Sequence, residues 1–134
     1  MSTSDYPTVL IVDDLAFVRK SLTEIFKANH FNVIGEAADG QAAIKQYALL
    51  KPDLVTMDMV MPTMSGLEAT KAIMDEHPDA KIIIISALAQ EQVVMEAVAA
   101  GAKDYIVKPF KTEDVIKTAR HVLSLNKPLR AANM

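Results

Sequence analysis

Short apolar runs alternate along the chain with longer segments whose apolar residues recur every three or four positions. The short runs are rich in β-branched residues, which predicts strands. Three of them are almost unbroken in apolar character, as is typical of strands covered on both faces of a parallel sheet. The longer segments have the spacing of helices with one buried face. The predicted strands are residues 8–12, 31–34, 53–57, 82–85 and 105–107.

Local signals mark where some of the helices begin and end. Glu68 stands three residues after Ser65, which is the spacing of a capping box, so a helix is expected to begin there. Gly101 follows an apolar helical pattern and suits the left-handed conformation that ends many helices. Five strand–helix units of this size predict an α/β fold with a single open five-stranded parallel sheet and helices on both faces, because right-handed crossovers return the chain to the sheet.

Length and composition indicate one globular domain spanning residues 1–134. Of the 134 residues, 51% are hydrophobic and 23% are charged, which is enough apolar material for one core. We expect an ordered core at about residues 8–125 and a flexible tail at 126–134. The net charge of −3, the lack of cysteine and the lack of a long apolar run predict a cytoplasmic protein that binds neither nucleic acid nor membrane.

Side chains with useful chemistry follow four of the five predicted strands. In open α/β sheets, ligands bind beyond the carboxyl ends of the strands. Like charges about 4 Å apart repel by roughly 4 kcal/mol at an effective dielectric constant near 20, so three aspartates at this edge require a cation. Hard carboxylate oxygens suit Mg²⁺, and its charge together with one lysine balances three carboxylates. These positions hold Asp13, Asp14, Asp58, Ser86 and Lys108.

Taken singly, two of these residues have ordinary structural explanations. Asp14 alone could cap a helix, and Ser86 alone could form a turn. It is their position beside the other acidic residues and the lysine that favours a binding site.

The motifs around these residues resemble those of receiver domains of two-component response regulators, and most of all the single-domain chemotaxis regulators of the CheY type. The resemblance covers about residues 8–125 and implies the flavodoxin-like strand order 2-1-3-4-5. Its carriers are Val9-Leu10-Ile11-Val12-Asp13-Asp14, Met57-Asp58-Met59-Val60-Met61-Pro62, Met64-Ser65-Gly66, Ile85-Ser86-Ala87 and Tyr105-Ile106-Val107-Lys108-Pro109-Phe110.

The resemblance also implies roles for individual residues. Asp58 matches the aspartate that accepts a phosphoryl group from a histidine kinase. Asp13 and Asp14 match the acidic pair that holds Mg²⁺, and Asp58 together with the backbone carbonyl of Val60 would complete the protein ligands. Lys108 matches the lysine that neutralises charge on the phosphoryl oxygens.

A second group of residues matches the part of the family that changes on phosphorylation. Ser86 and Tyr105 match the switch pair, in which the hydroxyl moves onto a phosphoryl oxygen and the ring turns inward. Serine stands where threonine is commoner, and it keeps the hydroxyl. The bond between Lys108 and Pro109 matches a cis peptide that would turn the lysine inward. Val60 and Leu88 match positions beside the path of the hydrolytic water, and neither can hydrogen-bond to it, so slow self-hydrolysis is expected.

The resulting hypothesis is an Mg²⁺-dependent phosphoacceptor switch that acts by altered partner binding, in chemotaxis, and that is not an enzyme although it dephosphorylates itself. The implied partners are a chemotaxis-type histidine kinase, the flagellar motor switch protein and a phosphatase. One alternative is a phosphorelay carrier that passes its phosphate to a histidine phosphotransfer protein. A less favoured alternative is a phosphatase with an aspartyl nucleophile, because Asp13 and Asp14 are adjacent and do not form a DxD element.

Overall fold

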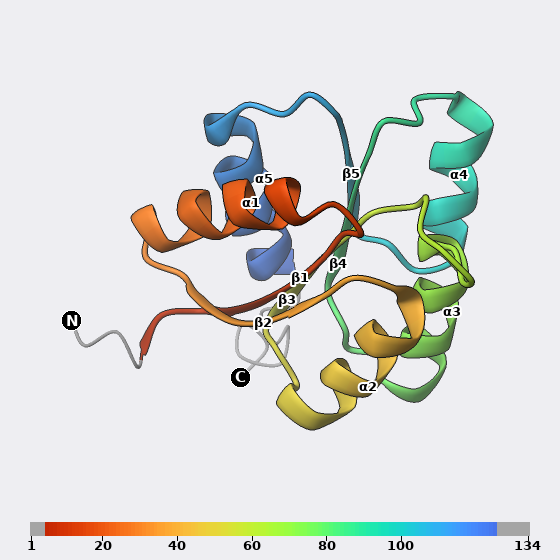
Figure 1. The fold of residues 1–134 in the computed structure, drawn as a ribbon, viewed down its shortest axis with the longest axis horizontal. Coiled ribbons are helices and arrows are strands. Elements are labelled where there is room, and N and C mark those ends of the chain that lie inside the picture. Colours follow the sequence, from red (N-terminus) through yellow and green to blue (C-terminus); the bar gives the residue numbers. More distant parts are fainter. Residues whose placement is uncertain (1–4, 126–134) are drawn as a thin grey trace, which may run out of the picture.

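The computed structural model describes residues 5–125, within which five strands alternate with five helices (Figure 1). The strands form one parallel sheet in the order β2-β1-β3-β4-β5. This confirms the predicted fold class and the strand order implied by the resemblance, whereas the predicted tail at 126–134 lies outside the described residues. The elements are β1 (Thr8–Val12), α1 (Ala16–Ala28), β2 (Asn32–Ala37), α2 (Gly40–Leu50), β3 (Leu54–Met57), α3 (Gly66–Glu76), β4 (Ile82–Ser86), α4 (Glu91–Ala99), β5 (Asp104–Val107) and α5 (Thr112–Leu125).

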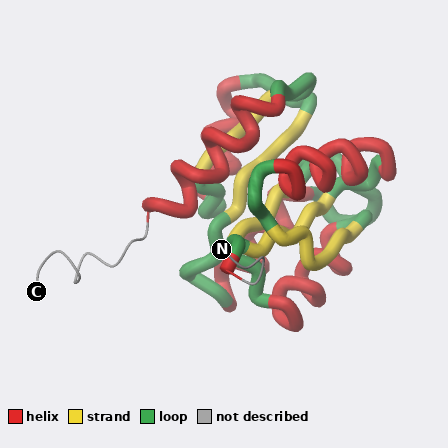
Figure 2. Tube along the Cα trace, turned by 90° about the vertical axis from the view of Figure 1, so that its left-hand side faces the viewer, coloured by secondary structure: helices red, strands yellow, loops and turns green. Residues whose placement is uncertain are grey.

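The sheet separates two apolar layers, with α1 and α5 on one face and α2, α3 and α4 on the other (Figures 1 and 2). Successive residues of β1 point to opposite faces, as the strand repeat requires. Val9 and Ile11 pack in the layer of α1 and α5, and Leu10 and Val12 pack in the other layer. Burial on both faces explains why these strands are nearly continuous apolar runs in the sequence.

The second strand extends three residues beyond the predicted run of 31–34, to Ala37. Its last residues include Gly35 and Glu36, which interrupt the apolar pattern. Within the described residues β2 pairs only with β1, so it is an edge strand on which a charged side chain can reach water. The extension matters for the site because the Asp13 N–H donates a hydrogen bond of 3.0 Å to the Ala37 carbonyl.

The capping signals predicted from the sequence are present. The Ser65 hydroxyl accepts a hydrogen bond from the Glu68 N–H at 3.1 Å, and the Ser65 N–H donates to the Glu68 carboxylate at 3.0 Å. Gly101 lies just beyond α4 with a φ of 115°. Both signals therefore have the structural role that their spacing predicts. Within residues 5–125, no helix combines the length and the apolar character needed to cross a membrane.

Candidate functional site

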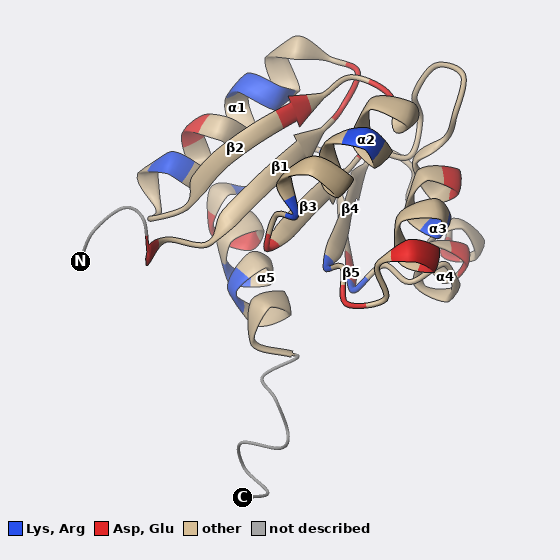
Figure 3. Ribbon diagram, turned by 90° about the horizontal axis from the view of Figure 1, so that it is seen from below, with Lys and Arg blue, Asp and Glu red and all other residues tan. Residues whose placement is uncertain are grey.

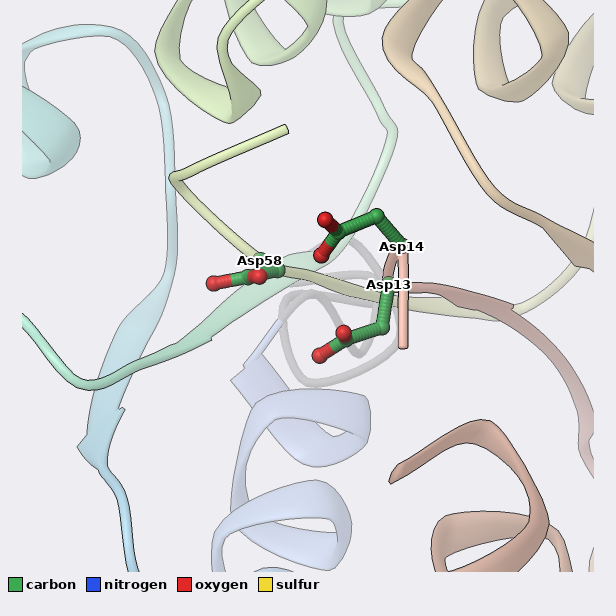
Figure 4. A group of neighbouring side chains, drawn as sticks. All are labelled: Asp13, Asp14 and Asp58. Atoms are coloured by element: carbon green, nitrogen blue, oxygen red, sulfur yellow. The ribbon is translucent and has the colours of Figure 1, made fainter. Parts of the chain in front are cut away.

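Three aspartates meet at the carboxyl ends of β1 and β3, which are neighbours in the sheet (Figure 4). The strands are paired so that Val12 lies opposite Met57, and Asp13 and Asp58 follow directly. One carboxylate oxygen from each of Asp13, Asp14 and Asp58 lies within 4.8 Å of the others. Asp13 and Asp58 are buried, and Asp14 lies nearer to solvent. The predicted convergence of the three carboxylates is therefore present.

Asp13 is held through every polar group that it carries. Its Oδ1 accepts a hydrogen bond from the Leu15 N–H at 3.0 Å, and its Oδ2 accepts one from Lys108 Nζ at 2.9 Å. Its N–H donates to Ala37, and its main-chain carbonyl accepts a 2.7 Å bond from Arg19 Nη1. The sequence carries no signal that predicts this contact of Arg19.

Lys108 places one positive charge between two of the carboxylates. The peptide between Lys108 and Pro109 is cis, as expected. The Lys108 ammonium lies 2.9 Å from Asp13 Oδ2 and 3.7 Å from Asp58 Oδ2. One ammonium against three carboxylates leaves two negative charges in excess, and a divalent cation would balance them. The donor set of carboxylate oxygens, two of them buried and one near solvent, fits a hard cation such as Mg²⁺.

The Asp58 carboxyl is in an environment that disfavours its charge. Burial raises the pKa of Asp58 above its ordinary value, and the nearby Asp13 carboxylate raises it further. The Lys108 ammonium and the N–H groups of Val60 and Met59 act in the opposite direction on this pKa. The Val60 peptide thus lies at the site, whereas the metal-ligand role of its carbonyl stays a prediction.

Gly66 lies close against the backbone of Asp58 and Met59. Its N–H donates a 2.9 Å hydrogen bond to the Met59 carbonyl. A Cβ at this position would overlap the carbonyl oxygen of Asp58, so a glycine is required for this close approach. Gly66 belongs to a motif that is visible in the sequence, but its close approach to Asp58 has no sequence signal.

Ser86 and Tyr105 come together through a third residue, Leu88, on the other side of the site. The buried Ser86 hydroxyl accepts a hydrogen bond from the Leu88 N–H at 3.2 Å, and the Tyr105 hydroxyl donates to the Leu88 carbonyl at 2.6 Å. Burial raises the pKa of Tyr105, and the Ser86 hydroxyl opposes that rise. The main-chain N–H of Lys108 donates to the Ser86 carbonyl, which ties this group to the lysine.

Comparison with known proteins agrees with this geometry. The sequence pattern of the response regulator receiver domain matches residues 9–120. The chain belongs to this family. This receiver domain is 50% identical over 114 residues to the chemotaxis protein CheY of Thermotoga maritima. The aligned residues make up 85% of this chain and 95% of that protein. It is 44% identical over 116 residues to CheY of Bacillus subtilis, and these residues make up 87% of this chain and 97% of that protein.

A solved structure shows the same fold as this receiver domain. It is a chain of the CheX–CheY–BeF3–Mg²⁺ complex from Borrelia burgdorferi, with a TM-score of 0.84 and 42% identity. The match covers 86% of this chain and 87% of that one. The resemblance to receiver domains, and to chemotaxis regulators of the CheY type among them, is confirmed.

Proposed function

We propose that this receiver domain is an Mg²⁺-dependent phosphoacceptor switch in chemotaxis, phosphorylated on Asp58 by a histidine kinase. The observation that carries the proposal is the buried Asp58 carboxylate, which lies within 4.8 Å of two further aspartates and 3.7 Å from the Lys108 ammonium. The similarity to CheY proteins along most of the chain supports the same assignment.

Asp13, Asp14, Asp58 and the backbone carbonyl of Val60 are the residues that would hold Mg²⁺. When bound, the ion would supply positive charge to the oxygens of the transferred phosphoryl group. Asp13 brings a carboxylate whose direction is already fixed by its hydrogen bonds, and Asp14 brings one that is open to solvent.

Phosphoryl transfer requires a nucleophile and a cation placed around one phosphorus atom. An Asp58 carboxylate oxygen forms the bond to phosphorus while the phosphorus–nitrogen bond to the donor imidazole breaks, and the imidazole nitrogen keeps the electron pair. The Lys108 ammonium, 3.7 Å from Asp58 Oδ2, is placed to neutralise charge on an equatorial oxygen. Catalysis by this chain is therefore mainly positioning and electrostatic stabilisation.

The output is a change in the surface beside Ser86 and Tyr105. Tyr105 lies on β5, which ends at the exposed Val107. Helix α4 exposes Met95 and Val98. Exposed apolar side chains of this kind favour contact with a protein partner. We assign this surface to the flagellar motor switch protein and the donor role to a chemotaxis-type histidine kinase.

Labelling with a small phosphodonor tests the assignment directly. The chain is incubated with acetyl phosphate and Mg²⁺, and intact mass is expected to rise by one phosphoryl group, which is lost in mild base. Asp58→Asn and excess EDTA should each abolish the gain, whereas Asp75→Asn, an exposed aspartate on α3, should label as the parent does. Full labelling of Asp58→Asn, or labelling without a divalent cation, would overturn the proposal.

Partner binding is tested with the beryllofluoride form of the protein. Immobilised flagellar motor switch protein should retain the chain with beryllofluoride and Mg²⁺ more strongly than the chain with Mg²⁺ alone. Equal retention of the two forms would contradict the assignment. Transfer of phosphate from the labelled chain to a histidine phosphotransfer protein would show a phosphorelay carrier instead.

A further inference from the structure

Arg19 links three parts of the fold behind the acidic cluster. It lies in the first turn of α1, and its Nη1 donates to the main-chain carbonyl of Asp13 at 2.7 Å. Its Nε donates to Glu36 Oε1 on the edge strand β2 at 2.9 Å. Figure 3 shows the acidic band of β2 beside the basic band near the start of α1. The Arg19 side chain is only 19% exposed, so its guanidinium is largely packed against the protein.

The carbonyl that Arg19 binds belongs to the peptide that joins Asp13 to Asp14. The orientation of this peptide plane sets how the two side chains diverge from β1. The Asp13 carboxylate has its own bonds to Leu15 and Lys108. The Asp14 carboxylate has no hydrogen bond or ion pair with any of residues 5–125, so its direction depends on the backbone that Arg19 holds.

We propose that Arg19, held in place by Glu36, is a positioning residue for divalent cation binding at the acidic cluster. It fixes the peptide between Asp13 and Asp14 so that both carboxylates are presented together. The inference rests on the proposed function, because it assigns to the cluster the cation that the phosphoacceptor site requires. Groups that orient metal ligands without touching the metal commonly change metal affinity by about 10–100-fold when they are removed.

Charge and geometry make opposite predictions for the loss of Arg19. Arg19 is a cation near three carboxylates, so its charge alone opposes the entry of a second cation, and its removal would tighten Mg²⁺ binding. If Arg19 acts by positioning, its removal weakens Mg²⁺ binding because the peptide between the two aspartates becomes free to turn. The sign of the change therefore separates the two roles.

Isothermal titration calorimetry of Mg²⁺ into the unphosphorylated full chain measures this sign without any phosphodonor. We expect Arg19→Ala to raise the dissociation constant about tenfold. Lys20→Ala is the matched control, because Lys20 is the next residue in α1, is exposed and carries the same charge. Its dissociation constant should stay within about twofold of the parent, since exposed charges are screened by salt. Arg19→Lys, which keeps the charge but not the two-pronged guanidinium, should fall between Arg19→Ala and the parent.

A double-mutant cycle with Glu36→Ala tests whether the ion pair acts as one unit. Glu36→Ala should raise the dissociation constant about threefold, and Arg19→Ala with Glu36→Ala should bind no more weakly than Arg19→Ala alone, because residues in one network are not additive. Circular dichroism checks that each variant folds. If Arg19→Ala does not fold, the two single variants Arg19→Lys and Glu36→Ala still test the inference. Unchanged or tighter binding by the Arg19 variants, or additive effects in the cycle, would overturn the inference. A parent chain that takes up no Mg²⁺ would overturn the proposed function itself.

Discussion

The two sides of the site are held in very different ways. On the side of β1, which we call the β1 half (Asp13, Asp14 and Arg19), the Asp13 residue is bonded to β2, α1 and Lys108. On the side of β4, which we call the β4 half (Ser86, Leu88 and Tyr105), the Ser86 and Tyr105 side chains are both bonded to the single residue Leu88. Asp13 in the β1 half is thus fixed by several segments of the fold, whereas both side chains of the β4 half depend on one loop residue.

Helix α1, which follows β1, is also more firmly packed than helix α4, which follows β4. α1 has 13 residues and buries Val18, Leu22 and Phe26, whereas α4 has nine residues and buries only Ala97. A segment with fewer buried apolar side chains rearranges at lower free energy. Two side-chain hydrogen bonds of about 1 kcal/mol each hold the side chains of the β4 half. In the proposed switch, this difference would let the β1 half keep its carboxylates in place while the β4 half moves.

The largest expected effect comes from displacing Asp58, which lies between the two halves. In Gly66→Ala the new Cβ overlaps the Asp58 carbonyl oxygen, so the loop that carries the nucleophile must shift. A misplacement of about 1 Å can reduce a reaction rate about 100-fold, and we expect a loss of this size in the rate of labelling by acetyl phosphate. The measurement is the initial rate of mass gain at saturating Mg²⁺.

Gly35→Ala is the matched control for this substitution. The three atoms nearest to its added Cβ are side-chain ends of Gln46, Leu50 and Leu10, none of which belongs to the Asp58 loop. It should therefore label at close to the parent rate. A Gly66→Ala chain that labels as fast as Gly35→Ala would show that the Asp58 loop does not need this close approach.

The next effect concerns the lifetime of the phosphorylated state. Val60 and Leu88 flank the expected water path and offer no hydrogen-bonding side chain. Val60→Asn together with Leu88→Glu should orient the water and speed loss of phosphate by about tenfold or more. Phosphate release is followed after the donor is removed. Val60→Leu with Leu88→Met, which keeps both side chains apolar, is the control, and release from the polar double variant at the control's rate would refute the idea.

A smaller effect is expected on the free energy of unfolding without metal, because the Asp13 carboxylate of the β1 half repels the Asp58 carboxylate. Burial and Asp13 raise the pKa of Asp58, so the folded state binds the proton more strongly than the unfolded chain does. Stability is therefore lost as pH rises from the unfolded aspartate value near 4 through the higher folded value. Asp58→Asn removes this loss, and it should exceed the parent in free energy of unfolding by about 1 to 3 kcal/mol at neutral pH.

Urea unfolding in EDTA from pH 4 to 7 measures this difference. The advantage of Asp58→Asn should be small at pH 4 and should grow toward pH 7. Asp75→Asn changes an exposed aspartate and should show no such growth. An Asp58→Asn advantage that is constant or shrinks with pH would contradict clustering of the carboxylates.

The smallest effect is expected in the β4 half alone. Tyr105→Phe removes the hydroxyl that donates to the Leu88 carbonyl and should lower the free energy of unfolding by about 1 kcal/mol. Because the β1 half makes no use of this bond, the Mg²⁺ dissociation constant should not change. Tyr6→Phe is the control, since the Tyr6 hydroxyl makes no hydrogen bond within residues 5–125. A large change in Mg²⁺ affinity in Tyr105→Phe would show that the two halves are coupled.

The parts of this molecule that the sequence predicts are those with local or periodic causes. Apolar runs predict the buried strands because both faces of the sheet are covered, and Ser65 with Glu68 predicts a helix start because the cap lies within one turn. The aspartates could be placed together because they follow strands that share one edge. The end of β2 was missed because an edge strand tolerates Gly35 and Glu36 without an apolar signal.

Other parts of the site depend on contacts between distant segments. No sequence signal separates an arginine that bonds to the protein from an arginine that faces solvent in the first turn of a helix. The hydrogen bond from Arg19 to the Asp13 carbonyl could therefore not be predicted from the sequence. The role of Leu88 rests on its backbone N–H and carbonyl, which any residue could supply. The contact of Gly66 with Asp58 is visible only when the chain has folded back on itself.

The ion pair between Asp13 and Lys108 joins residues that are 95 positions apart in the chain. During synthesis from the amino terminus, the aspartates that follow β1 and β3 emerge well before β5 and the lysine that follows it. Until β5 is added at the far edge of the sheet, the acidic cluster lacks the lysine that neutralises part of its charge. A nascent or truncated chain that ends before β5 would therefore carry Asp58 without this counter-charge, and under the proposed function it should not form a working phosphoacceptor site.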